Sequence, residues 1–305
     1  MSRSLSSFAV VALALLNTAP AVARTILVSP GPGTPLQDAI DAAAPGDTIK
    51  LADGTYTEAV VVDKALRLRG PRQIGLQAAW IDAGCAASAA LTIAADDVSV
   101  KSVNVTRGTF YTVDVQSRDR ILLKDMAVTE VGGLGCGAVE YGINVYDSTN
   151  VRIERCDVLG DVNGYTGVAG YHDAGIYIGG IPSEGNVRVN DAFVVGNNRG
   201  IILEDSTDVP GGRDTVRVQK SSLSSNDTGI FVHNSDGMRM YRNFTNDSRG
   251  STPAVSIELD GTSDDNLIRA NEFTDAAVDV IDNGASNCWQ ANTVETGTVP
   301  TGGCP

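Results

Sequence analysis

The sequence has 305 residues and is acidic, with 37 Asp and Glu against 23 Lys and Arg and a formal net charge of −14. A chain of this charge repels nucleic acid, so we exclude nucleic acid as a partner. Aromatic residues make up only 5% of the chain, whereas glycine occurs 33 times. This composition favours short strands joined by tight turns.

The first 23 residues have the three parts of a secretory signal. Arg3 supplies a positive charge, residues 8–16 are apolar, and Ala21 to Ala23 form a small-residue cleavage site. The apolar run is too short to span a bilayer. We therefore expect an exported protein, extracellular or periplasmic, without membrane insertion, in which residues 24–305 form a single domain.

A short strand pattern recurs through the middle and end of the chain. Its central apolar residue returns at intervals of roughly 23 to 33 residues, which is the range of a stacked repeat. These central residues are Val113, Ile143, Ile176, Ile201, Ile230, Val255 and Val278. The pattern predicts that each repeat is one coil of a solenoid.

A second strand accompanies each repeat, and its alternation predicts which side chains point inward. One inward column holds Val100, Leu123, Ile153, Val189, Val218, Met240 and Ile268, and a later one holds Val103, Met126, Cys156, Ala192, Ser221, Asn243 and Asn271. Asn at a bend inside a stack is expected to bond the backbone of the neighbouring coil. The predicted fold is an all-β parallel β-helix of about eight coils.

These motifs resemble a known superfamily. The segments DAGIYIGG from Asp173 and RGIILEDS from Arg199 are similar to secreted β-helix repeat proteins of the NosD type, within the pectin-lyase-like superfamily of right-handed parallel β-helices. The stretch from Leu36 resembles the family's N-terminal cap, which implies a short capping helix around Leu36 to Ala43. The superfamily includes lyases, hydrolases, epimerases and tailspikes, so the resemblance implies the fold and leaves the activity open.

Five cysteines in an exported chain predict disulfides with one thiol left over. Cys288 and Cys304 flank the last coil, so we expect them to form a disulfide that holds the C-terminal tail against that coil. Cys85 and Cys136 lie in Gly-rich loops and form the second expected pair. Cys156 occupies an inward position and is expected to be a buried free thiol.

The outward positions of the second strand place Arg152, Arg188, Arg217 and Arg239 in one column on four successive coils. Like charges this close repel unless they are neutralised. Two interpretations stay open. Either local acids such as Glu154, Asp157 and Asp191 neutralise the arginines, or the arginine column binds carboxylates or sulfates on a glycan.

The outward positions of the first strand favour sugar binding. Tyr146, Tyr177 and Phe231 lie there with Glu204 and His233 beside them, and Glu258 is expected next to His233. Aromatic rings stack on the C–H faces of sugars, and carboxylates accept hydrogen bonds from hydroxyl groups. Aromatic residues are also good strand formers, which is the alternative explanation.

Residues 160–173 form a long Gly-rich loop that holds the candidate catalytic groups Tyr171, His172 and Asp173, with Tyr165 as a candidate substrate-binding residue. Tyr171-His-Asp is similar to the histidine-bearing motif of alginate epimerases. A uronate lyase or epimerase needs a base, a proton donor and a cation for the carboxylate; His172 or either tyrosine fits the first two roles, and Arg152 or Arg188 the third. The alternative is that His172 is a solvated loop residue.

Metal chemistry has little support in the sequence. The chain has two His and no CxxC spacing, so we expect no zinc site, and Met238 and Met240 are expected in the core rather than on copper. We expect no cofactor, with calcium at turn acids such as Asp264 as the alternative. The sequence thus predicts a monomeric secreted β-helix that acts on a uronate-containing polysaccharide, the alternative being a non-catalytic surface protein that binds glycan or has a structural role.

Overall fold

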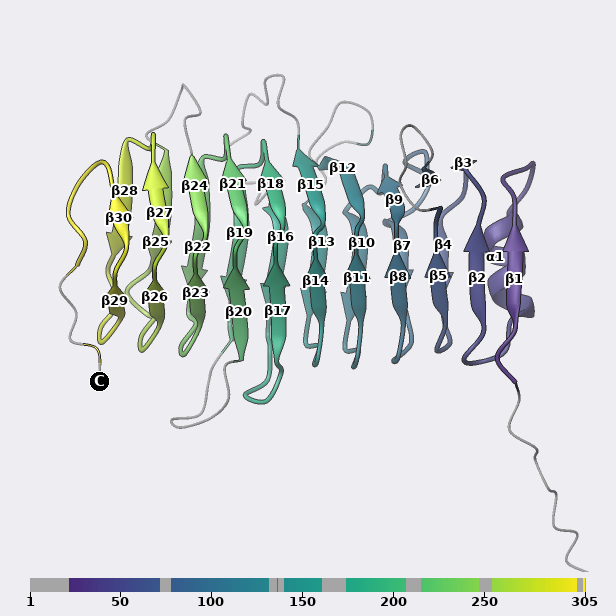
Figure 1. Ribbon diagram of the computed structural model, residues 1–305, viewed down its shortest axis with the longest axis horizontal. Coiled ribbons are helices and arrows are strands. Elements are labelled where there is room, and N and C mark those ends of the chain that lie inside the picture. Colours follow the sequence, from purple (N-terminus) through teal and green to yellow (C-terminus); the bar gives the residue numbers. More distant parts are fainter. Residues whose placement is uncertain are drawn as a thin grey trace, which may run out of the picture.

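A computed structural model describes residues 22–71, 78–131, 136, 140–160, 174–206, 215–246, 254–300 and 304. In it the chain winds into a right-handed parallel β-helix, whose strands stack into three parallel sheets along one long axis (Figure 1). The fold predicted from the repeats is confirmed. The helix α1 (Pro35–Ala42) lies at the N-terminal end, where the capping helix was expected. Leu36 and Ile40 are its buried side chains.

The first sheet has eleven strands among the described residues and takes one strand from each coil. In spatial order these are β1 (Thr25–Val28), β2 (Thr48–Leu51), β5 (Arg67–Arg69), β8 (Ser99–Lys101), β11 (Leu122–Lys124), β14 (Arg152–Glu154), β17 (Val187–Asn190), β20 (Val216–Gln219), β23 (Arg239–Tyr241), β26 (Leu267–Arg269) and β29 (Cys288–Gln290).

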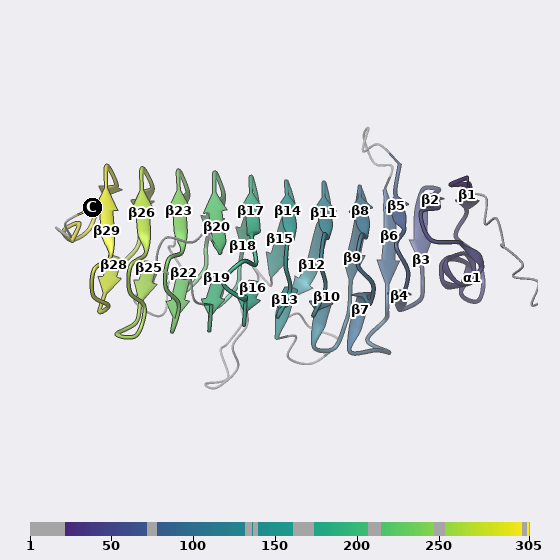
Figure 2. The ribbon, with the colours of Figure 1, turned by 90° about the horizontal axis from the view of Figure 1, so that it is seen from below.

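The second sheet has nine described strands, which in chain order are β4 (Val60–Val62), β7 (Ala89–Ile93), β10 (Tyr111–Gln116), β13 (Tyr141–Tyr146), β16 (Ala174–Gly179), β19 (Arg199–Glu204), β22 (Thr228–His233), β25 (Val255–Leu259) and β28 (Val278–Asp282). The third has ten: β3 (Gly54–Tyr56), β6 (Ala79–Asp82), β9 (Val103–Thr106), β12 (Ala127–Val131), β15 (Asp157–Gly160), β18 (Phe193–Val195), β21 (Ser222–Ser224), β24 (Phe244–Asn246), β27 (Glu272–Thr274) and β30 (Thr293–Val294). Figure 2 shows the eleven-stranded and nine-stranded sheets on different sides of the coil.

The stack is longer than the expected eight coils, since one sheet alone has eleven described strands. The strands before β10 explain the difference. They pair in the same way, as in β7 with β10, where Leu91 lies beside Val113. Their sequences lack the Gly-Ile pattern from which the coils were counted.

The predicted inward columns form the core. Val100, Leu123 and Ile153 are in register on neighbouring coils and are fully buried, as are the later members of their column. Burying a side chain of this size contributes about 1.5–3 kcal/mol, so stacking one per coil stabilises the whole length of the helix. Met238 and Met240 are also buried in this core, as expected.

The second inward column ends in an asparagine ladder. The backbone N–H of Asn243 donates to Oδ1 of Asn271 at 2.8 Å, and the side-chain amide of Asn243 donates to the carbonyl of Val218 at 3.1 Å. Asn271 repeats the pattern with Asn292. The amides therefore satisfy buried backbone groups between coils, which is the role predicted for them.

One register prediction was wrong. The repeat places Val255 beside Ile230, whereas in the structure Val255 pairs with Thr228 and Ile257 pairs with Ile230. The segment Val255–Leu259 alternates apolar and polar residues, so a shift of two positions leaves the same side chains pointing inward. The hydrophobic pattern alone cannot distinguish the two registers.

A left-handed residue forms the corner between the first and third sheets in each of eight coils. The φ angles of these residues lie between 50° and 54°. They are Ser102, Asp125, Arg155, Asp191, Lys220, Arg242, Ala270 and Ala291. None of them is glycine, although this conformation is unfavourable for residues with a Cβ. The stacked neighbours must therefore hold each corner in place.

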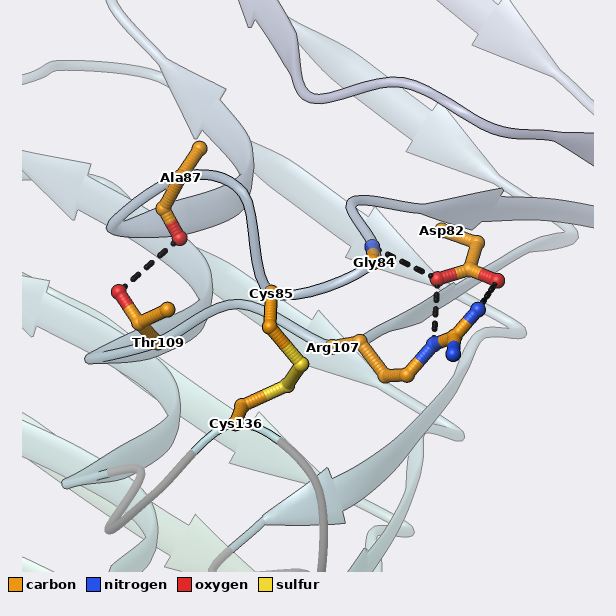
Figure 3. Close-up of a disulfide and its surroundings, with 7 residues drawn as sticks. All are labelled: Asp82, Gly84, Cys85, Ala87, Arg107, Thr109 and Cys136. Atoms are coloured by element: carbon orange, nitrogen blue, oxygen red, sulfur yellow. Dashed lines mark hydrogen bonds and ion pairs between the residues drawn. A yellow bond between two sulfur atoms is a disulfide. The ribbon is translucent and has the colours of Figure 1, made fainter.

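Both predicted disulfides are present. Cys85 is bonded to Cys136, and Cys288 to Cys304, with Cα atoms 4.9 and 4.8 Å apart. Figure 3 shows Cys85–Cys136 close to the ion pair between Asp82 and Arg107, in which Nε of Arg107 donates to Oδ1 of Asp82 at 2.7 Å. Cys156 is a buried free thiol as expected, and burial raises its pKa to about 12.

Candidate functional site

Aromatic rings stack across three coils on the outer face of the nine-stranded sheet. The ring centroids of Tyr111 and Tyr141 are 5.9 Å apart, and those of Tyr141 and Tyr177 are 4.3 Å apart. Ile202 packs against Tyr177 on the next coil. The sheet therefore has an apolar layer outside its core, which leaves little of the Tyr177 ring exposed.

Glycine makes room for this packing at the end of β16. A Cβ built on Gly179 would lie 2.4 Å from the hydroxyl of Tyr177, and one on Gly180 would lie 2.9 Å from the Tyr146 ring. No side chain could occupy either space without moving a ring. Gly179 thus leaves room for the Tyr177 ring along its own strand, and Gly180 leaves room for the Tyr146 ring of the preceding coil.

Tyr177 and Glu204 form the first polar contact of the site. Burial raises the pKa of the Tyr177 phenol well above its usual range, and the hydrogen bond to Glu204 raises it further. The phenol therefore stays protonated at neutral pH and donates to the carboxylate. In this arrangement Tyr177 orients Glu204, and it is a poor base.

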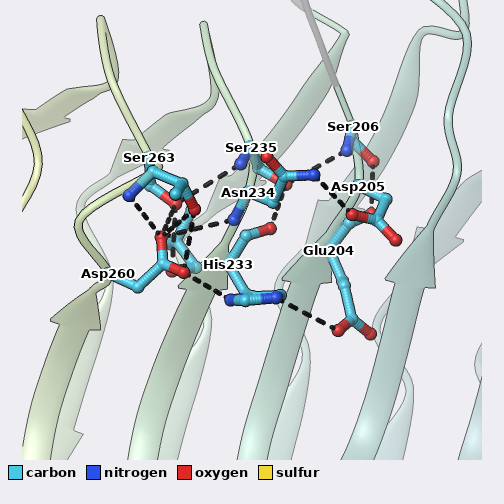
Figure 4. Close-up of polar contacts among 10 residues, drawn as sticks. Glu204, Asp205, Ser206, His233, Asn234, Ser235, Asp260 and Ser263 are labelled. Atoms are coloured by element: carbon cyan, nitrogen blue, oxygen red, sulfur yellow. Dashed lines mark hydrogen bonds and ion pairs between the residues drawn. The ribbon is translucent and has the colours of Figure 1, made fainter.

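His233 lies between two carboxylates (Figure 4). Its Nδ1 is hydrogen-bonded to Oδ2 of Asp260, and its Nε2 lies 3.9 Å from Oε1 of Glu204. An ionised Asp260 selects the tautomer with the proton on Nδ1, because a carboxylate accepts and does not donate. In that tautomer Nε2 is the acceptor nitrogen of the neutral ring, and a ligand can reach the ring because 44% of the side chain is exposed.

Asp260 is held ionised by its surroundings. Burial by itself raises its pKa, but hydrogen bonds from the hydroxyls of Ser263 and Thr262 and from backbone N–H groups outweigh burial and lower the pKa to about 2. Ser263 Oγ donates to Oδ1 of Asp260 at 2.7 Å. A carboxylate fixed in this way orients the imidazole and stays charged beside it.

Arg199 adds positive charge to the same face. Its guanidinium carbon lies 4.2 Å from the centroid of the Phe231 ring, within cation–π range. Burial lowers the pKa of Arg199, while the charges of Glu258 and Glu204 oppose that shift. The site therefore combines a cation, an imidazole and carboxylates on neighbouring strands.

Not all of the predicted site residues come together. Tyr146, Glu204 and His233 do lie on this face, and Tyr146 is 45% exposed. Tyr177 lies there too, but it is only 8% exposed, because Tyr141 and Ile202 cover it, so it does not offer an open stacking surface. Tyr165, Tyr171, His172 and Asp173 lie outside the described residues.

The two arginines assigned to the same site lie elsewhere. Arg152 and Arg188 pair across β14 and β17 of the eleven-stranded sheet, on a different side of the coil. The sequence gives the spacing of these strands along the chain but not the angle of the corner between them. They therefore cannot act at one ligand atom together with His233 and Glu204.

Two important residues of the site were missed. The register of β25 was set two residues off, which placed Glu258 beside His233; in the structure Glu258 pairs with Phe231, and Asp260 reaches the histidine. Arg199 was noted only as part of a repeat. It is the first residue of β19 and pairs with Thr228. A charged residue at the start of an otherwise apolar strand was the sequence feature that could have identified it.

Copper is the metal that the family resemblance suggests, and the described residues do not fit it. No group of three His, Cys, Asp or Glu side chains gathers as a metal site in the described part of the chain. Cys156, Met238 and Met240 are fully buried in the core, and His233 already bonds a carboxylate. Copper sites need several such ligands near one another.

The fold and site define a right-handed parallel β-helix with a polar, ring-lined outer face. The family model described as periplasmic copper-binding protein (NosD) matches residues 95–303, and the chain belongs to that family. No curated protein matches the sequence. No helix among the described residues is long and apolar enough to cross a membrane.

Solved structures resemble the chain at low identity. The A-module of a mannuronan C-5 epimerase from Azotobacter vinelandii is 13% identical, with a TM-score of 0.48, over 86% of this chain and 92% of that one. An alginate lyase from Paenibacillus is 12% identical, with a TM-score of 0.44, over 90% and 98%. The pectate lyase Pel9A is 13% identical, with a TM-score of 0.44, over 90% and 78%. At these identities the matches say nothing about chemistry.

Proposed function

We propose that this protein binds a polysaccharide on the outer face of the nine-stranded sheet and carries out acid–base chemistry on it. The observation that carries the proposal is the position of His233, which is hydrogen-bonded to Asp260 through Nδ1, faces Glu204 with Nε2 and has 44% of its side chain exposed. A base with a fixed tautomer on an exposed, ring-lined surface is what a proton abstraction needs. The family description as periplasmic supports an exported location.

The substrate class that suits these residues is a uronate-containing polysaccharide. Nε2 of His233 takes the C5 proton, and Arg199 neutralises the carboxylate on that carbon. The electron pair left at C5 forms the C4–C5 double bond as the C4–O bond breaks, or it takes a proton on the opposite face. The first outcome is a lyase reaction and the second an epimerisation.

The proton donor for either outcome is assigned to the loop that immediately precedes β16 in the sequence. Tyr171 and His172 are the candidates, with Asp173 as the partner of the histidine. Tyr146, exposed on a neighbouring part of the same sheet, would stack on another sugar of the chain.

A non-catalytic glycan-binding role is the second candidate. The observation that favours it is the number of bonds already made within the site, since Asp260 and Glu204 both hold protein groups. A surface with its polar groups fixed in this way can bind sugar hydroxyl groups without reacting.

The test is a screen of the purified chain from residue 24 on polyuronates. Absorbance of unsaturated products reports elimination, and solvent proton exchange at C5 by NMR reports epimerisation. His233→Ala should lower turnover about 10²- to 10⁴-fold, the usual contribution of a general base. Thr92→Ala, on the outer face of β7 in the same sheet, is the matched control.

Two results discriminate between the two functions, and a third tests the assignment of the base. Turnover lost in His233→Ala and retained in Thr92→Ala supports the enzyme. Glycan binding without turnover in the unchanged chain supports the binding role. Turnover that survives in His233→Ala rejects His233 as the base.

A further inference from the structure

We propose that the outer face of the eleven-stranded sheet is a second binding site, which takes a linear anionic polysaccharide along the long axis of the β-helix. The site is separate from the one described above and does not depend on its function. Ten of the 23 Lys and Arg residues lie on the strands of this sheet, and none of the ten is buried. The only carboxylate on those described strands is Glu154.

This concentration runs against the composition of the chain. With 37 Asp and Glu against 23 Lys and Arg, a random distribution would on average place more acids than bases on a face. The nine-stranded sheet follows that expectation, since its described strands hold Asp114, Glu204, Glu258, Asp279 and Asp282 but one arginine. The basic face therefore reflects a specific arrangement and not the overall charge.

Four arginines form the centre of the face. Arg152, Arg188, Arg217 and Arg239 pair directly from β14 to β23, which places one guanidinium on each of four successive coils at intervals of about 4.8 Å. Arginine is weakly hydrated and binds carboxylate or sulfate oxygens through two N–H groups. A column of this kind suits a ligand that repeats its negative charges along a line.

The contacts of Arg152 and Arg188 leave this part of the column positively charged. Arg152 lies 3.7 Å from Glu154, but that carboxylate already accepts a hydrogen bond from Nζ of Lys124. Nε of Arg188 donates to the neutral amide oxygen of Asn186 at 2.9 Å. Of the three acids expected to neutralise the column, Glu154 is the one found beside Arg152, and it is shared.

Two hollows on this side of the coil strengthen the assignment. One has a volume of about 550 Å³, and its walls include Arg152 and Arg188 together with Arg120, which is paired with Asp97 and Asp119. The other has a volume of about 390 Å³, and its walls include Lys220, Arg242 and Arg269. No carboxylate lines either hollow among the described residues. Sugar rings or their charged substituents can enter such hollows while the polysaccharide runs along the column of arginines.

A polysaccharide fits this face better than a nucleic acid. Proteins that hold single strands offer a series of rings on which bases stack. The strands of this sheet carry two aromatic side chains in their described residues, Tyr241 and Trp289, and Trp289 is buried. The acidic remainder of the chain would also repel a long nucleic acid that extends past the face.

The experiment measures retention of the full mature chain on immobilised heparin and on immobilised polygalacturonate, as a sulfated and a carboxylated probe. We expect retention at about 0.1 M salt and elution as salt rises, because screening weakens exposed charge pairs. The double variant Arg152→Gln/Arg188→Gln should weaken the dissociation constant roughly tenfold and elute at lower salt. The control Arg24→Gln/Lys64→Gln removes two cations that lie outside the column of four arginines and should elute like the unchanged chain. Because Arg24 pairs with the buried Asp47 and Lys64 bonds the carbonyls at the end of α1, this control is expected to melt at a lower temperature.

Circular dichroism and thermal melting of each variant separate loss of the site from loss of the fold. The proposal would be overturned if the unchanged chain bound neither probe. It would also be overturned if both double variants remained folded and lost the same amount of retention. Equally strong retention on single-stranded DNA would replace it with unspecific polyanion binding. His233→Ala should be retained on heparin like the unchanged chain, so the two proposed sites are tested independently.

Discussion

The ring of Tyr177 stacks on the ring of Tyr141 from the neighbouring coil, with centroids 4.3 Å apart and planes 14° from parallel. This contact lies on the outside of the β-helix, where strand side chains usually meet water. It buries a phenol whose hydroxyl reaches Glu204. The stack therefore connects the packing of the sheet to the orientation of a carboxylate beside His233.

Gly179→Ala tests this connection. The added Cβ would meet the Tyr177 ring, so we expect a loss of about 1–3 kcal/mol in the free energy of unfolding, as for an overpacked core position. Denaturant unfolding measures it. Gly261→Ala is the control, because its nearest neighbour would lie at an ordinary 3.6 Å. Equal stability of the two variants would mean that Tyr177 moves freely.

The C-terminal disulfide should stabilise the fold. Cys288 and Cys304 are 16 residues apart, and replacing both by alanine should cost on the order of 2–4 kcal/mol according to the loop-entropy estimate. The midpoint of denaturant unfolding reports this loss. Peptide mapping of the unchanged protein provides the check, since recovery of both residues as free thiols would contradict the bond.

Acid should destabilise the site through Asp260. Its pKa is lowered from 3.8 to about 2 in the folded state, so the contribution of its charge is fully present above pH 3.8 and is lost as the pH falls through about 2. In Asp260→Asn the fall in stability across this range should be shallower. Glu272→Gln, an exposed carboxylate on the ten-stranded sheet, is the control. Parallel pH curves for Asp260→Asn and the unchanged protein would contradict the prediction.

Ala270→Gly should stabilise the protein. Ala270 has a φ of 54°, a conformation that glycine adopts without a steric penalty, so the expected gain is about 0.5–1 kcal/mol after the entropy of the unfolded glycine is included. Ala39→Gly within α1 should have the opposite effect, a loss of about 1 kcal/mol. Thermal melting of the two variants gives the signs directly.

The sequence was sufficient to predict the coil and its core. Inward residues such as Leu123 and Ile153 repeat because every coil must bury the same positions, and a periodic pattern records this directly. The early coils were missed because their strands satisfy the same packing with a different sequence. Both disulfides were predicted correctly, Cys288–Cys304 because the two residues flank the last coil and Cys85–Cys136 because both lie in Gly-rich loops.

The candidate site was harder to predict, for two physical reasons. A two-residue slip of β25 costs nothing in hydrophobic pattern, yet it decides whether Glu258 or Asp260 meets His233. Likewise, alternation places Tyr177 outside the core, but whether a neighbouring ring covers it depends on the twist and lean of side chains. These are contacts between coils, and no local pattern encodes them.

The separation of charge between two faces has a consequence for how the molecule behaves in solution. A body with acids on one side and bases on another has a permanent electric moment across its short dimension, whatever its total charge. Two such bodies attract when the acidic side of one faces the basic side of the other. Light scattering at low ionic strength should therefore show weaker repulsion between molecules than a net charge of −14 alone would give, and the difference should disappear as the Debye length contracts to about 10 Å at 0.1 M salt.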